Sequence, residues 1–184
     1  MAQIVVVYHS GYGHTKKAAE AVVRGAGSVA GVAVHLINVD DVKDDFSAFA
    51  AADGIIFGSP TYMGGPSAQF KAFIDAASKV WFQQGWKDKV AAGFTNSGTL
   101  SGDKSNTLQA LFVNAMQHGM IWVGNAQMVG GSAPTDINRL GSYSGVMTQS
   151  DRGPVEEQPP AGDLATAENF GRRVAEVTLK LKGA

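Results

Sequence analysis

The chain has 184 residues, of which 45% are hydrophobic and 17% charged, and its formal net charge is −1 at pH 7. This length suits one domain spanning residues 1–184, and the near-neutral charge gives no field to attract nucleic acid or an anionic membrane. No cysteine is present, which excludes disulfides, thiolate metal sites, iron–sulfur clusters and cysteine nucleophiles, and we predict no metal site.

Strand-like and helical patterns alternate along the chain. Residues 4–8 form an apolar β-branched run, typical of a strand buried on both faces. Such runs are too short to span a bilayer, and the segment before this one lacks the basic region of a signal peptide. We therefore expect a cytoplasmic protein without membrane insertion. The remaining predicted strands are 32–39, 54–58, 89–98 and 120–129, and the predicted helices are 15–27, 46–52, 68–80, 108–116 and 164–181.

Five strands that alternate with helices indicate an α/β fold with a parallel sheet covered on both faces. Ligands bind such sheets outside the carboxyl ends of the strands. Three loops leave these ends with many Gly, Ser and Thr residues, at 9–15, 59–66 and 95–105, and we expect them to converge on one crevice. Residues 130–162 show no clear period and are a candidate lid or interface.

The first loop has the composition of a phosphate-binding turn. Lys16 stands where a dinucleotide fingerprint needs its third glycine, and no Walker A triplet follows. What remains is Ser10, Gly13 and Thr15 at the start of a helix, where hydroxyls and free N–H groups suit a phosphate. Lys16 and Lys17 are disfavoured in a first helical turn unless an anion is bound. The alternative is a tight turn in which Thr15 only caps the helix.

Several segments in order carry a resemblance to a known family. They are "YHSGYGHT" (8–15), "FGSPTYMGGPS" (57–67), "FTNSGT" (94–99), "HGM" (118–120) and the terminal "KLKGA" (180–184). Together they resemble the flavodoxin-like NAD(P)H:quinone oxidoreductases of the WrbA family over essentially the whole chain. The resemblance implies a doubly wound five-stranded parallel sheet, strand order 2-1-3-4-5, with FMN as cofactor. Two features depart from the family: a short segment before residue 54, and "TYMGG" where many members have Thr-Arg-Phe-Gly-Asn.

The resemblance assigns FMN contacts to the three loops. The first would wrap the phosphate, the second would line one edge of the isoalloxazine, and the third would reach the ribityl and pyrimidine side. In that order the implied residues are Ser10, Tyr12, Gly13, His14 and Thr15; Pro60, Thr61, Tyr62, Met63, Gly64 and Gly65; and Asn96, Ser97, Gly98 and Thr99.

Two further residues receive a role from the resemblance. His118 would approach the flavin O2 region and act in catalysis by stabilising negative charge on the reduced ring. Its alternative role is that of a helix C-terminal residue favoured by the dipole. Trp81 would contact the flavin or substrate of a partner subunit in a homodimer or homotetramer, unless it simply caps the core at a helix end.

The function implied is a two-electron transfer from NADH or NADPH through FMN to a quinone or similar acceptor, with no nucleic-acid partner. Donor and acceptor would use the same face of the flavin in turn. Three alternatives stay open. They are a flavodoxin-type electron carrier, a flavin-free regulatory or scaffold protein with the same fold, and a Rossmann domain that binds NAD.

Overall fold

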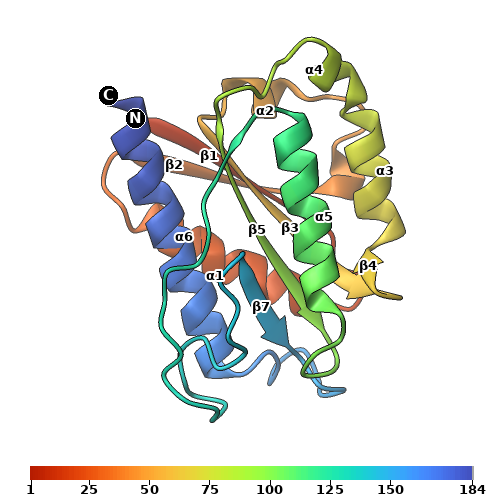
Figure 1. The fold of residues 1–184 in the computed structure, drawn as a ribbon, viewed down its shortest axis with the longest axis vertical. Helices are drawn as coiled ribbons and strands as arrows, with labels where there is room; N and C mark the ends of the chain where they lie inside the picture. Colours follow the sequence, from red (N-terminus) through yellow and green to blue (C-terminus); the bar gives the residue numbers. More distant parts are fainter. Residues whose placement is uncertain (184) are drawn as a thin grey trace.

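The computed structural model describes residues 1–183, in which a central parallel sheet lies between two layers of helices (Figure 1). The strand order is β2-β1-β3-β5-β6, with β7 paired to β5 and a short β4 paired antiparallel to β3. The strands are β1 (Ala2–Tyr8), β2 (Val32–Asn38), β3 (Gly54–Tyr62), β4 (Gly65–Pro66), β5 (Val90–Ser97), β6 (Ile121–Trp122) and β7 (Val146–Gln149). The expected parallel sheet and its strand order are therefore confirmed, with additional short strands.

Six α-helices and one 3-10 turn (Val39–Asp41) connect the strands within the described residues. The helices are α1 (His14–Gly27), α2 (Ser47–Ala51), α3 (Ala68–Ala76), α4 (Ser78–Phe82), α5 (Lys104–Gln117) and α6 (Ala161–Lys182). Packing places α1 and α6 on one face of the sheet and α2, α3 and α5 on the other (Figure 1). Across residues 1–183, no helix combines the length and the apolar character needed to cross a membrane.

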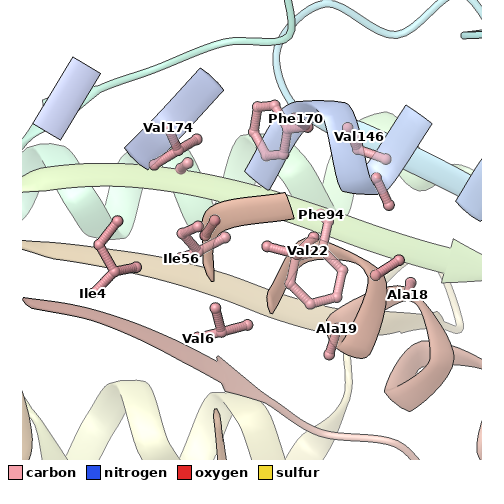
Figure 2. Packing of buried hydrophobic residues seen from close by; sticks show 14 of the residues in the cluster. Ile4, Val6, Ala18, Ala19, Val22, Ile56, Phe94, Val146, Phe170 and Val174 are labelled. Carbon is pink, nitrogen blue, oxygen red and sulfur yellow. The ribbon is translucent and has the colours of Figure 1, made fainter. Parts of the chain in front are cut away.

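The alternation of side chains along β1 creates a core on each face of the sheet. Ile4 and Val6 point toward α1 and α6, whereas Val5 and Val7 point toward the opposite helices. Figure 2 shows the first core, where side chains of β1, β3, β5 and β7 meet those of α1 and α6. The two helices approach closely, because a Cβ at Gly171 would lie 2.0 Å from a backbone oxygen of α1.

The predicted strand 120–129 is wrong beyond its first residues. The chain leaves the sheet after β6, where Gly124 lies so close to the Tyr143 carbonyl that a Cβ would come within 2.6 Å of it. It returns as β7, so two short strands share the fifth position of the sheet, both paired to β5. β7 lies inside the segment 130–162 that was expected to lack regular structure.

The bounds of one strand and one helix also differ from the prediction. β3 continues through Pro60 and Thr61 to Tyr62, into residues that were expected to form a loop. The predicted helix 68–80 is divided at Ala77 into α3 and α4. The extension of β3 matters for the site, because it carries the second loop's residues out along a rigid strand.

Candidate functional site

A cavity of about 430 Å³ opens at the carboxyl ends of the central strands. Its volume lies in the range of small-molecule sites. Three segments expected to converge do so, and a fourth, after β7, joins them. The lining residues are Ser10, Tyr12, His14, Thr15, Pro60, Thr61, Tyr62, Asn96, Ser97, Gly98, Ser150, Asp151, Arg152 and Gly153.

The turn before α1 is shaped to receive an anion. The Ser10 hydroxyl oxygen accepts the N–H groups of Gly13 (3.0 Å) and Lys16 (3.2 Å), which leaves the hydroxyl proton able to donate to a ligand. The N-cap residue is Gly13, at φ 91°, so Thr15 does not cap the helix. Thr15 is instead buried at the cavity wall, in the first turn of α1, ahead of the bond from the Lys17 N–H to the Gly13 carbonyl (3.1 Å).

The second loop supplies one aromatic wall and the rim. Tyr62 lines the cavity, and its ring meets that of Tyr12 edge-on with centroids 6.2 Å apart. Tyr12 lines the cavity and is 78% exposed, so it stands at the mouth, whereas Met63 is fully exposed and is not among the lining residues. Gly64 and Gly65 do not line this cavity; they border a separate groove between α3 and α5.

Polar side chains beneath the cavity are tied to one another. The Thr61 hydroxyl lies 2.8 Å from the Thr95 hydroxyl and 2.7 Å from that of Thr107. The Asn96 amide donates to Ser150 Oγ at 3.0 Å and accepts from Thr148 Oγ1 at 2.8 Å. These internal bonds fix the backbone that faces the cavity.

The segment after β7 was not among the expected site residues. The Ser150 N–H donates to the Ser97 carbonyl at 3.0 Å, which continues the pairing of β7 with β5 into the loop. His14 Nε2 lies 3.0 Å from the Gly153 carbonyl and links the segment to α1. Arg152 adds a cation to the lining. No local motif indicates this placement; the only signal was that 130–162 is a candidate lid.

A buried lysine, also missed in the sequence, lies under the third loop. Lys104 opens α5, and its ammonium donates to Ser97 Oγ (2.8 Å), the Thr99 carbonyl (2.7 Å) and the Leu100 carbonyl (2.8 Å). Burial lowers the pKa of Lys104 to about 8, and the nearby Asp163 carboxylate opposes this shift. The pKa of Asp163 is itself raised by burial.

Asp163 belongs to an ion pair behind the same loop. Arg139 binds its carboxylate with two N–H groups, at 2.7 and 3.1 Å, and both side chains are buried. The Gln149 N–H also donates to Asp163, at 2.8 Å. The Gln149 side chain accepts from Arg139 at 2.9 Å and donates to the Gly98 carbonyl at 3.2 Å. The network joins α6, β7 and the third loop.

The structure does not bring His118 to the cavity. It caps the C-terminal end of α5, and the 14 residues of that helix place it about 21 Å from Lys104 along the axis. His118 is 3% exposed, and its ring lies against that of Trp86 with the centroids 4.3 Å apart and the planes tilted by 35°. Burial lowers the pKa of His118 to about 4. Within a single chain His118 therefore does not line this cavity, and the helix C-terminal position is the one observed.

Trp81 and Thr99 also lie outside the lining. Thr99 contributes its carbonyl to Lys104. Trp81 lies in α4, which follows α3 along the chain. Figure 1 shows α4 at the end of the molecule opposite the cavity. It is 42% exposed, and its neighbour Phe82 is 83% exposed. Trp81 thus neither caps a fully closed core nor reaches the cavity of its own chain.

The chain is similar to characterised and solved proteins along nearly its full length. The family described as NADPH-dependent FMN reductase matches residues 4–135. Flavodoxin FldP of Pseudomonas aeruginosa is 42% identical, covering 98% of this chain and 99% of that protein. An NAD(P)H dehydrogenase (quinone) of Methylocella silvestris is 35% identical over 100% of both chains.

A crystal structure supports the same assignment. The flavodoxin, WrbA-like protein from Agrobacterium tumefaciens is 46% identical, with a TM-score of 0.76, covering 98% of this chain and 99% of that one. The predicted flavodoxin-like fold and the predicted family are both confirmed. The chain belongs to the NADPH-dependent FMN reductase family, as a WrbA-like, FMN-dependent oxidoreductase with the flavodoxin-like fold.

Proposed function

We propose that residues 1–184 act as one domain that binds FMN in the cavity with its phosphate at the start of α1. The convergence of Ser10, Thr15 and the first N–H groups of α1 on one wall carries this proposal. The absence of acidic residues from the first turn of α1, together with Lys16 and Lys17 there, suits a dianion. Tyr62 and residues 96–98 line the cavity and form walls for a flat ring system.

The activity that fits this family and site is the transfer of two electrons from NADH or NADPH to a quinone. FMN bound in the cavity would supply the redox chemistry, namely acceptance of a hydride from the nicotinamide and return of two electrons to the acceptor. The protein binds and orients the reactants. The exposed rings of Tyr12 and Tyr62 at the mouth provide an apolar surface for a nicotinamide or a quinone ring.

An absorption spectrum of purified protein, recorded before and after anaerobic addition of NADPH or NADH, tests the cofactor and the donor together. We expect a flavin spectrum that bleaches with the donor and returns with benzoquinone. Steady-state rates should give parallel double-reciprocal lines, because one mouth serves both substrates. A colourless protein that takes up no FMN would contradict the proposal.

The second candidate function is that of an electron carrier, since one relative at 42% identity is named a flavodoxin. A carrier would bind FMN yet show no turnover of NAD(P)H with quinones, so the same experiment separates the two. The net charge of −1 favours the enzyme, because carriers that dock on proteins usually need a strong surface field.

We further propose a cytoplasmic homodimer or homotetramer in which Trp81 contacts the site of a second copy. Trp81 and Phe82 form an exposed aromatic pair that their own chain leaves uncovered. Trp81→Ala should lower quinone turnover and loosen the oligomer while the monomer stays folded. Light scattering that finds an active wild-type monomer would refute the shared site.

A further inference from the structure

The position of Lys104 is energetically unfavourable for a charged side chain in two respects. A fully buried ammonium loses its hydration, and a cation in the first turn of α5 opposes the helix dipole. Its three protons are nevertheless all used, on three oxygens of residues 97–100. A residue of similar length without charge would fill the same space, so the charge has to be explained by what it holds.

The bonds to Lys104 set the direction of the loop backbone. The peptide unit is planar and trans, so each carbonyl and the N–H of the next residue point in opposite directions. Because the Thr99 and Leu100 carbonyls face Lys104, the N–H groups of Leu100 and Ser101 face away from it. Ser97 Oγ also donates to the Thr99 carbonyl at 3.0 Å, so its proton is used inside the loop.

The loop has little other internal support on this side. Residues 99–101 are exposed, and Gly102, at φ 54°, lies so close to Ser97 that a Cβ would come within 2.2 Å of its Oγ. Among the described residues 97–101, those held from the β7 side are Ser97 and Gly98, through Ser150 and Gln149. Lys104 therefore holds the half of the loop that β7 does not reach.

We infer that Lys104 is a positioning residue for flavin: through its bonds to Ser97 Oγ and to the carbonyls of Thr99 and Leu100, it keeps Ser97 and Gly98, the residues of this loop that line the cavity, in the conformation that receives the ring portion of FMN. This inference rests on the proposed binding of FMN in the cavity. It predicts that loss of the ammonium costs flavin affinity more than it costs folding stability, because Asp163 keeps its pairing with Arg139.

Lys104→Met removes the donors and keeps most of the side-chain volume. We expect the FMN dissociation constant, measured by quenching of flavin fluorescence, to rise at least about tenfold, and amide exchange of residues 98–102 in the apoprotein to become faster. Lys89→Met is the matched control. Lys89 also donates to two carbonyls, those of Ala50 and Ala52, at the other end of the sheet, and its loss should leave flavin affinity unchanged.

Riboflavin, which lacks the phosphate, separates positioning from simple charge attraction. If Lys104 acts through the loop, Lys104→Met weakens riboflavin and FMN by the same factor. If the ammonium only attracts the phosphate, FMN alone is weakened, and the inference is overturned.

The pH dependence adds an independent readout. Lys104 has a pKa of about 8, so it loses a proton between pH 7 and about pH 9. The neutral amine has two protons for three acceptors, and the FMN affinity of the wild type should therefore fall over this range. The Lys104→Met variant should show no such fall. The charged groups facing Lys104 are Asp163 of α6 and Arg139 from the segment before β7.

The outcomes also separate this inference from the proposed function. Wild-type protein that binds no FMN would defeat the proposed function itself. Wild-type protein that binds FMN, with a Lys104→Met variant that binds it equally or whose loop amides exchange at the wild-type rate, would defeat only the role of Lys104.

Discussion

The two ends of the sheet each bury an ionisable side chain in different surroundings. At the carboxyl end, Lys104 donates to three oxygens beneath a cavity. At the amino end, His118 packs on Trp86 among aromatic rings, and within the described residues its Nδ1 has no hydrogen-bond partner. Burial lowers both pKa values, to about 8 and about 4. In this protein a shifted pKa therefore indicates only that the side chain is buried. Whether the side chain belongs to a binding site or to the core is shown by the groups that it contacts.

The largest effect is expected at the amino end and on stability. Trp86 is fully buried, with the rings of Phe46, Phe49 and Phe73 within 6.3 Å. Trp86→Ala should lower the free energy of unfolding by about 3–5 kcal/mol, measured by urea denaturation, because it leaves a cavity. FMN affinity of the folded variant should not change. Loss of affinity in the folded variant would show that the two ends are coupled.

Phe82→Ala is the control for this comparison. Phe82 is an aromatic side chain at the same end of the molecule, but it is exposed. Its removal should change the free energy of unfolding of the isolated chain by less than about 0.5 kcal/mol.

An intermediate effect is expected from His118 in acid. Its pKa is about 4 in the folded protein and near 6.5 in the unfolded chain, so the unfolded chain takes up the proton first as the pH falls. The free energy of unfolding should therefore be about 3 kcal/mol lower at pH 4 than above pH 6.5. His118→Phe should remove this part of the pH dependence, measured as the difference between denaturation curves at pH 7 and pH 4.

Two results would contradict the assignment of His118 to the core. One is a variant whose stability follows the same pH dependence as the wild type. The other is a folded His118→Phe variant that binds FMN normally yet loses quinone turnover, which would return His118 to catalysis. His9, whose pKa burial also lowers, is present in both proteins and cancels in the comparison.

The smallest effect is expected at the carboxyl end from a single hydroxyl. Thr15→Val should remove one hydrogen bond to the phosphate, which costs roughly 1–3 kcal/mol and weakens FMN binding about tenfold. Thr178→Val is the matched control, because the Thr178 hydroxyl is also buried but bonds to the Val174 carbonyl in α6. Equal FMN affinity in the two variants would refute the phosphate site at α1.

Much of the fold follows from periodicity in the sequence, because strands buried on both faces read as continuous apolar runs. The shared fifth strand does not, since β7 has four residues and its pairing depends on contacts distant in sequence. The lining from residues 10–15, 60–62 and 96–98 was predictable because loops at strand carboxyl ends meet.

Residues 150–153 and His118 are placed differently from the expectation, for different reasons. Residues 150–153 reach the cavity only through the register of β7 with β5, which no local pattern encodes. For His118 a signal was present. In alternating α/β topology, the residues between a helix and the next strand lie at the amino ends of the strands, and His118 stands between α5 and β6.

The shared fifth position also limits how copies of this chain can join. An edge strand invites extension of the sheet by another molecule when it offers a long row of free backbone groups. Here that border consists of two residues in β6 and four in β7, separated by the excursion that carries Arg139. Continuous strand addition at this border is therefore disfavoured, and copies of the chain that meet here have to use side chains of helices and loops instead.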